Sequence, residues 1–275
     1  MATTYTTYRF LNTPPMDAAT NMAIDEAILL HHLRGDSPPT LRSFRWERKA
    51  ISLGRFQDAG RELRLDRCEQ EGISLVRRPT GGRGVYHYDD FTYSLVISKQ
   101  YNVPQGVVAA YGYLAQGLIA ALHALNVPAV ISEEHVSKNP SAACFASSTQ
   151  ADLTSNGFKI VGSAQVWKKD ALLQQGSLPL KDHAAEFFDL LAFPDEEARA
   201  TALAKYLNTT TPLDTFVPEA SREEIGQAFR QGFSHVLGGE FIPGELSPSE
   251  LELTQQLVAE KYARLTWQQE RVQRV

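Results

Sequence analysis

The sequence predicts an α+β fold, in which a mixed β-sheet carries packed helices and a helical C-terminal part follows. Up to about residue 181, apolar runs typical of strands are interspersed with helical segments, whereas the segments after it are helical. Asn156-Gly157, a strong hairpin signal, separates two of the strand-like runs. We therefore expect an α+β core over residues 1–181 and a helical part over residues 182–275, packed on the same domain.

The first half is expected to begin with a helix. Pro14-Pro15 stops the first segment, and Asp17 can then cap a helix that runs to about His32 and ends at Gly35. Strands are expected over residues 41–53 (two, around a turn at 47–49), 91–97 and 128–131. An Ala- and Leu-rich helix is expected over residues 107–125.

The second half is expected to change from strands to helices. A strand meander is predicted over residues 150–154, 158–161 and 171–180, and helices over residues 184–192 and 195–207. Ser221 and Ser247 each stand three residues before a Glu, so each is expected to open a further helix with a capping box. Residues 132–149 have no clear periodicity, and long irregular loops in compact domains are often functional.

Composition excludes several classes of protein. The net charge of −5 makes a general nucleic-acid binder improbable, because such proteins are usually basic. No run of about 18 apolar residues predicts a membrane span, and the N-terminus does not resemble a signal peptide. Two cysteines form neither a disulfide framework nor a zinc site. We therefore expect a cytoplasmic protein without a metal or cofactor.

Residues 77–87 are the most informative stretch. Arg77 and Arg78 follow a strand-like run and offer forked donors for a carboxylate or phosphate, while Gly81 and Gly82 let backbone approach a ligand closely. The plainer interpretation is a tight turn with solvated arginines.

Together with three other segments, this stretch resembles the biotin/lipoate protein ligase superfamily. The other segments are residues 21–27, 156–165 (with Lys159-Ile160-Val161-Gly162-Ser163-Ala164-Gln165) and 173–178, and the resemblance runs from about residue 8 to the C-terminus. It implies a ligase-like catalytic α+β core. Cys144, between small residues, favours the cysteine/lysine-type octanoyltransferases within that superfamily.

The resemblance implies roles that the residues alone leave open. A lone cysteine is more often a buried small residue, and a strand lysine more often faces solvent. In the octanoyltransferases the cysteine is the nucleophile and the lysine its partner, so Cys144 and Lys159 are expected to be catalytic. The residues expected to bind substrate are Arg77, Arg78, Gly81, Gly82, His87, Gly162, Ser163, Ala164, Gln165, Gly176 and Ser177, with Gln175 a further candidate.

The function expected from the resemblance is transfer of an octanoyl group from octanoyl-acyl carrier protein to a lysine of a lipoyl domain or glycine-cleavage H protein. The alternatives are an ATP-dependent lipoate–protein ligase, a lipoyl or octanoyl amidotransferase, and a non-catalytic binder of carrier or lipoyl domains. A biotin ligase would leave Cys144 unexplained. Arg61, Arg64 and Arg67, expected on one helix face, are a candidate docking surface for an acidic carrier, and Cys68 beside them is expected to be structural.

Overall fold

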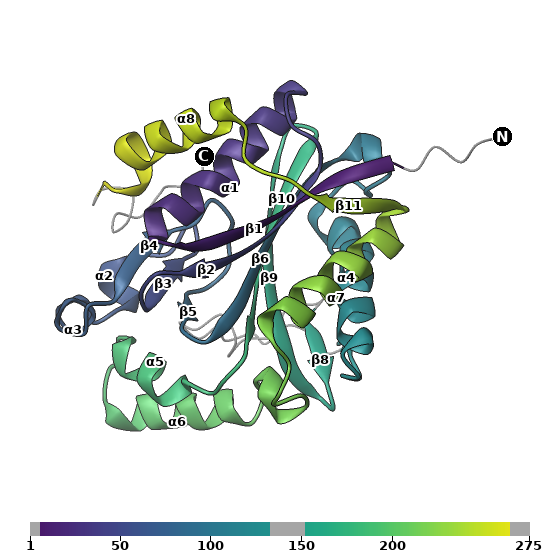
Figure 1. Ribbon diagram of the computed structural model, residues 1–275. Coiled ribbons are helices and arrows are strands. Elements are labelled where there is room, and N and C mark those ends of the chain that lie inside the picture. Colours follow the sequence, from purple (N-terminus) through teal and green to yellow (C-terminus); the bar gives the residue numbers. More distant parts are fainter. Residues whose placement is uncertain (1–5, 133–151, 265–275) are drawn as a thin grey trace.

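The computed structural model describes residues 6–132 and 152–264, and its backbone confirms the α+β class (Figure 1). An eight-stranded mixed sheet runs in the order β11-β1-β2-β6-β10-β9-β8-β7. Its strands are β1 (Thr6–Met16), β2 (Thr40–Trp46), β6 (Asp90–Ser98), β7 (Val130–Ile131), β8 (Leu153–Ser155), β9 (Phe158–Lys168), β10 (Ala171–Pro179) and β11 (Gly239–Pro243). β1 pairs in parallel with β11 and β2, and the other pairs are antiparallel.

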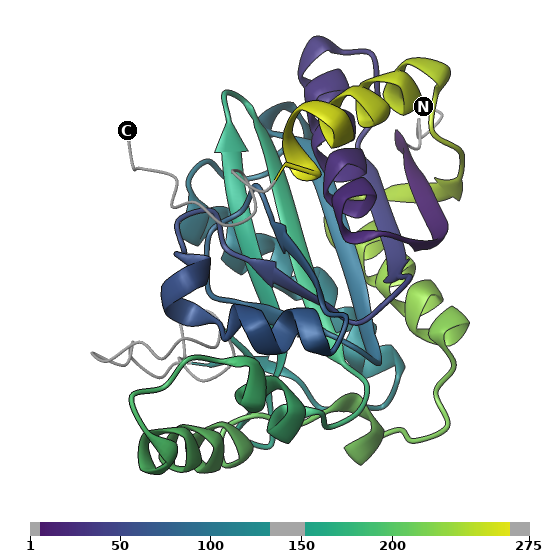
Figure 2. The same ribbon diagram turned by 90° about the vertical axis from the view of Figure 1, so that its left-hand side faces the viewer.

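A three-stranded sheet in the order β4-β3-β5 lies beside the large sheet (Figure 2). It consists of β3 (Ala50–Leu53), β4 (Ser74–Arg77) and β5 (Val85–His87). An apolar cluster joins it to the helices α2 (Ala59–Glu62), α3 (Leu65–Gln70), α5 (Ala184–Leu190) and α6 (Glu196–Leu207). The small sheet therefore has its own packing and can hold a loop against the large sheet.

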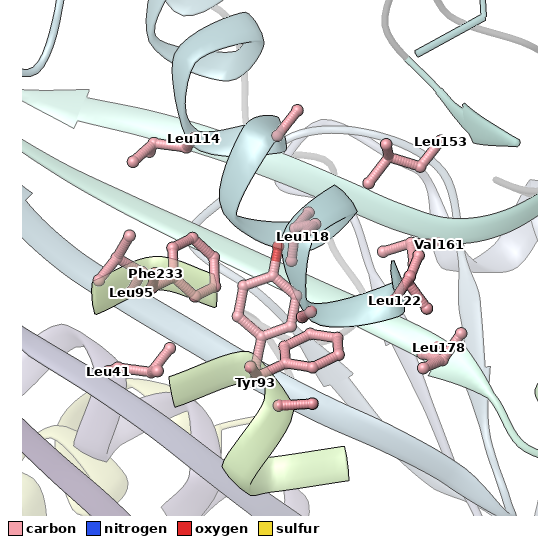
Figure 3. Packing of buried hydrophobic residues seen from close by; sticks show 14 of the residues in the cluster. Leu41, Tyr93, Leu95, Leu114, Leu118, Leu122, Leu153, Val161, Leu178 and Phe233 are labelled. Carbon is pink, nitrogen blue, oxygen red and sulfur yellow. The ribbon is translucent and has the colours of Figure 1, made fainter. Parts of the chain in front are cut away.

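Helices cover both faces of the large sheet (Figure 1). The helices α1 (Ala18–Arg34) and α8 (Pro248–Leu257) pack together on one face, and α4 (Val107–Ala124) and α7 (Arg222–Leu237) on the other. Figure 3 shows Tyr93 of β6 among leucines of α4 and Phe233 of α7. A Cβ on Gly232 would lie 2.2 Å from the carbonyl oxygen of Gly117, so glycine is what lets these two helices approach so closely.

α4 is long and apolar enough to cross a bilayer by length and composition. In this fold, its leucines instead fill the largest apolar cluster, where Leu114, Leu118 and Leu122 are fully buried. Packing against the sheet therefore accounts for the apolar character of the helix.

The predicted caps and turns are confirmed where sequence alone determines them. Asp17 accepts a hydrogen bond from the Thr20 amide, and Gly35 ends α1 with a left-handed φ of 85°. Both capping boxes are present, at Ser221 and Ser247. Asn156 and Gly157 both have positive φ and connect β8 to β9, as a two-residue hairpin turn requires.

Two expectations, on Pro14-Pro15 and on the three arginines, need correction, and two features of the sheets were not predicted. β1 continues through Pro14-Pro15, because a register shift between Asn12 and Pro15 accommodates the prolines at this point. The two strands within residues 41–53 belong to different sheets. β11 was not expected, since among the described strands it pairs with β1 alone, more than 220 residues earlier. Arg61 and Arg67 lie on two separate short helices, with Arg64 between them, so no single helix face carries all three.

The helical part after residue 181 is closely connected to the core. α7 packs on α4, β11 extends the large sheet beside β1, and α8 packs on α1. The division at residue 181 stays a prediction.

Candidate functional site

A narrow cavity lies between the two sheets and collects most of the predicted substrate-binding residues. β2, β3, β5, β6, β9 and β10 all contribute to it, with Met22 from α1. Its lining is Met22, Phe44, Trp46, Ser52, Arg78, Val85, His87, Thr92, Gly162, Ser163, Ala164, Gln175, Gly176 and Ser177. Segments that are far apart in sequence therefore meet where sequence analysis expects a ligand.

His87 is fixed on both ring nitrogens and on one ring face. Its Nδ1 lies 2.7 Å from Asp90 Oδ2 and its Nε2 lies 2.8 Å from Ser52 Oγ. The indole of Trp46 stacks on the imidazole with centroids 4.0 Å apart. These contacts hold the imidazole in one orientation, and His87 itself lines the cavity.

Asp90 is buried beneath His87 and is held as a carboxylate. Burial alone would raise its pKa, but the charge and hydrogen bond of His87 oppose this, together with hydroxyl donors from Thr92 and Ser177 at 2.7 and 2.8 Å. The net effect holds the pKa of Asp90 below its ordinary value.

Arg78 lines the cavity, and its guanidinium group donates hydrogen bonds that hold the glycine loop, Gly81-Gly82, in place. Its Nη2 donates to the carbonyls of Gly81 and Arg83 at 2.7 and 2.8 Å, and its Nη1 donates to the Ser52 carbonyl at 2.8 Å. Gly82 has a φ of 91°, and a Cβ there would lie 2.8 Å from Arg78 Nη2. Glycine at position 82 therefore lets the loop wrap around the guanidinium.

Arg77 is fully buried and points into the protein. Its Nη1 donates to the carbonyls of Gly54, Arg55 and Gln57, at 3.1, 3.2 and 2.6 Å. Solvated arginines, the plainer interpretation of this stretch, are therefore wrong. Both arginine side chains donate hydrogen bonds to backbone carbonyls of the loops around the cavity. That they bind substrate stays a prediction.

The floor of the cavity comes from the small residues of β9 and β10. Gly162, Ser163 and Ala164 pair with Ser177, Gly176 and Gln175, so backbone lies open between the side chains. Ser163 Oγ lies 2.9 Å from the Tyr93 hydroxyl. Gln165 donates to Gln174 at 2.6 Å and is not part of the cavity lining.

A buried polar chain links the cavity to α1, and it includes Arg78 and Gln175, which were expected to contact substrate, together with Thr80 and Asp25, which had no assigned role. Arg78 Nε donates to Thr80 Oγ1, which donates to Gln175; Gln175 Nε2 then donates to Asp25 Oδ2 at 2.7 Å. Arg42, fully buried, binds the other oxygen of Asp25 at 2.8 Å. Segment 21–27 is one of those that carried the family resemblance, and its Asp25 connects Gln175 of the cavity lining to the buried Arg42.

Ser52, Trp46, Asp90 and Thr92 are site residues that were not predicted from the sequence, and Phe44 and Val85 of the lining are others. Each lies in or beside a strand, where polar residues at single positions give no local signal. His87 and Asp90 stand three residues apart, and this spacing is the one hint the sequence offers.

Lys159 is 5% exposed, so the interpretation that it is a solvent-facing strand lysine is wrong. Its Nζ lies 3.0 Å from Asp152 Oδ1, and its backbone bonds to Thr209 and Thr211. The register of β8 and β9 shifts here, so that Lys159 and Val161 pair with the adjacent residues Thr154 and Leu153. Such bulges often re-aim a side chain near an active site. Its predicted partner, Cys144, lies outside the described residues.

Cys68 is buried in α3, as expected of a structural thiol. Burial, with nearby Glu71 and Asp66, raises the pKa of this thiol to about 11. A protonated thiol is a poor nucleophile. In the described ranges, no group of three or more His, Cys, Asp or Glu side chains is arranged to hold a metal ion.

The sequence model of the lipoyl protein ligase A/B catalytic domain matches residues 17–234. A protein named octanoyltransferase LipM from Kyrpidia tusciae is 36% identical, over 95% of this chain and 98% of its own length. Another of that name, from Carboxydothermus hydrogenoformans, is 38% identical with the same coverage of both chains.

Solved structures of ligases share the fold. Lipoate-protein ligase A bound with ATP superposes with a TM-score of 0.80 at 26% identity, covering 97% of this chain and 100% of that one. A bipartite lipoate protein ligase from Thermoplasma acidophilum gives a TM-score of 0.83 at 24% identity, covering 98% and 99%, and this likeness concerns the fold alone.

Proposed function

Because this chain belongs to the lipoyl protein ligase A/B catalytic domain family, we propose that it is the octanoyltransferase of a lipoate biosynthesis route. The observation that carries the proposal is the 36–38% identity to octanoyltransferases along nearly the whole chain. The acceptor is a lipoyl-domain protein. The donor we propose is octanoyl-acyl carrier protein, and the two-cysteine composition supports work in the reducing cytoplasm.

The proposed reaction has two half-reactions. The Cys144 thiolate attacks the carbonyl of the donor thioester, the C–S bond to the carrier breaks, and the carrier thiol leaves with a proton. The acceptor lysine then attacks the octanoyl-Cys144 carbonyl, forms the amide and releases the Cys144 sulfur. A lysine ammonium beside a thiol lowers the thiol pKa, which is the proposed role of Lys159. Its fixed position at the β9 bulge supports that role.

The cavity between the sheets is the proposed site of the acyl group. Small residues at 162, 163, 164 and 176 leave room beside the backbone, and Phe44, Trp46 and Val85 give an apolar wall. The Gly81-Gly82 loop held by Arg78 lies next to the cavity, since a Cβ on Gly82 would be 3.8 Å from the Cβ of Ala164, which lines it. Binding of substrate by Arg77, Arg78, Gly81, Gly82, His87, Gly162, Ser163, Ala164, Gln165, Gly176 and Ser177 remains part of this proposal.

A transfer assay tests the proposal. Octanoyl-acyl carrier protein and an apo lipoyl domain are mixed with enzyme without ATP, and octanoylation of the domain is followed by mass. Cys144→Ala is expected to abolish transfer, because no thioester can form. Cys68→Ala is the matched control and is expected to retain it, since this thiol is buried and protonated. Full transfer by Cys144→Ala would contradict the proposal.

The likeness to a lipoate-protein ligase that binds ATP favours a second candidate, the ATP-dependent ligase. In that reaction Arg77, Arg78, the Gly81-Gly82 loop and Lys159 would surround an acyl-adenylate. The same assay separates the two functions, because a ligase would need ATP and free lipoate or octanoate. Modification of the acceptor only under those conditions would replace the transferase by the ligase.

A further inference from the structure

Ser52, His87 and Asp90 form a hydrogen-bonded line on three different strands. Ser52 Oγ lies 2.8 Å from His87 Nε2, and His87 Nδ1 lies 2.7 Å from Asp90 Oδ2. All three side chains are at least 95% buried, and the first two line the cavity. The arrangement matches, group for group, the hydroxyl, imidazole and carboxylate of serine-type acyl-transfer enzymes.

The neighbours of this line favour one direction for its protons. Arg78 can only donate, and its Nη1 lies 3.3 Å from Ser52 Oγ, so the serine accepts from Arg78 and has its own proton available for His87 Nε2. Nδ1–H of His87 then donates to Asp90. Trp46 donates to Thr92 at 2.9 Å, and Thr92 passes its proton towards Asp90 Oδ2. In the neutral imidazole whose proton lies on Nδ1, Nε2 presents its lone pair to the serine hydroxyl, and the Asp90 carboxylate lies behind the ring.

A second buried serine–histidine pair shows what is particular to this one. Ser98 Oγ lies 3.1 Å from His32 Nε2, and His32 Nδ1 lies 2.8 Å from the carbonyl oxygen of Ser37. His32 thus has a neutral carbonyl where His87 has a carboxylate, and neither Ser98 nor His32 lines the cavity between the sheets. The Ser52 line joins a lining hydroxyl to a carboxylate through an imidazole, which can take up a proton, whereas the lining hydroxyls of Thr92 and Ser177 bond to Asp90 directly.

We infer that Ser52, His87 and Asp90 are a proton relay that deprotonates the amine of the acceptor lysine. The inference rests on the proposed function, because the relay acts on an acyl-enzyme. The acceptor arrives as an ammonium, which has no lone pair for attack. Ser52 Oγ takes a proton from it while passing its own proton to His87 Nε2, and Asp90 stabilises the imidazolium.

The full step balances. The thioester and the ammonium give an amide, a Cys144 thiol and one proton. The C–N bond forms and the C–S bond breaks, with its electron pair moving to sulfur. Of the two protons that nitrogen loses, one ends on the thiol and the other leaves to solvent. Nothing is oxidised or reduced, and no further reactant is needed.

Two nucleophiles test the relay on the same acyl-enzyme. Octanoyl-enzyme is prepared with the donor, and its discharge is timed with an apo lipoyl domain and, separately, with hydroxylamine, which is uncharged at neutral pH and needs no initial deprotonation. For Ser52→Ala the ratio of the lysine rate to the hydroxylamine rate is expected to fall by about 100-fold from wild type, the usual scale of a general base. Ser52→Thr keeps a hydroxyl and is expected to restore most of the ratio.

Ser98→Ala is the matched control, because it removes a buried serine–histidine bond outside the cavity. His87→Gln gives the same measurement if Ser52→Ala does not fold. An unchanged ratio in the folded Ser52 and His87 variants would overturn the relay, whether both rates fall together or neither does. An octanoyl group found on Ser52 itself would also overturn it, because the serine would then be a nucleophile. If wild type forms no acyl-enzyme, the proposed function fails first.

Discussion

Gly176 shows how tightly single residues are fitted around the cavity. A Cβ at this position would lie 2.2 Å from Cε1 of the Tyr93 ring. The ring cannot easily move away, because its hydroxyl bonds to Ser163 and Gln174 and the ring itself packs against the rings of Phe229 and Phe233. Gly176 was expected to bind substrate because it resembles a family position, and the packing of Tyr93 supplies a local steric reason for glycine there.

Gly176→Ala is therefore expected to destabilise the fold by about 1–3 kcal/mol, the usual cost of overpacking a buried site. Urea unfolding measures the change. Gly112→Ala in α4 is the matched control, because a Cβ there meets nothing within 4 Å. Removing a glycine from a helix interior should stabilise the chain by about 0.5–1 kcal/mol. Equal effects of the two substitutions would contradict the packing argument.

At the scale of elements, one ion pair joins the two ends of the described chain. Glu250, in the first turn of α8, accepts from both Nη atoms of Arg9 in β1, at 2.7 and 2.6 Å. The same carboxylate accepts from Ser37 and from the amide of Ser247. α8 is therefore held to the sheet by a fully buried group as well as by its packing on α1.

Glu250→Ala is expected to cost about 3–5 kcal/mol, because it leaves Arg9, itself largely buried, without its partner. Denaturant unfolding tests this. Glu224→Ala is the matched control: Glu224 completes the other capping box on an exposed surface, so its loss should cost about 1 kcal/mol at most. If both variants lose the same free energy of unfolding, the ion pair between Glu250 and Arg9 does not contribute to stability.

Acidification should act through the same carboxylate. Burial opposes the charged form of Glu250, but hydrogen bonds from Arg9, Ser37 and Ser247 and the Arg9 charge outweigh it and lower its pKa. A lowered folded-state pKa means that the unfolded chain binds the proton more tightly. The contribution of Glu250 to stability is therefore present above about pH 4.3, the unfolded value, and lost as pH falls through the folded pKa. Glu250→Gln should flatten this part of the acid unfolding curve.

At the scale of the whole molecule, most helices and strands could be predicted because their signals are local. The site could be predicted only in part, because contacts between distant residues form it. The capping residues Asp17, Ser221 and Ser247 and the turn at Asn156-Gly157 act within four residues, so the sequence alone predicts them. β11 depends on pairing with a strand at the other end of the chain, for which no nearby residue gives a signal.

The cavity follows the same division. Glycines and His87 were found because a motif surrounds them. The contacts of Ser52 and those from Thr80 through Gln175 to Asp25 were missed, because each of them spans tens of residues and exists only once both sheets have formed. The nucleophile and its mechanism came from family resemblance, and they stay predictions.

Cys144 is proposed to carry the octanoyl group between two proteins, and intact-mass spectrometry of the protein mixed with octanoyl-acyl carrier protein, without ATP, detects this step. We expect a gain of one octanoyl group, mapped to Cys144 by peptide analysis and lost when an apo lipoyl domain is added. An unmodified protein, or an octanoyl group on any other residue, would contradict it.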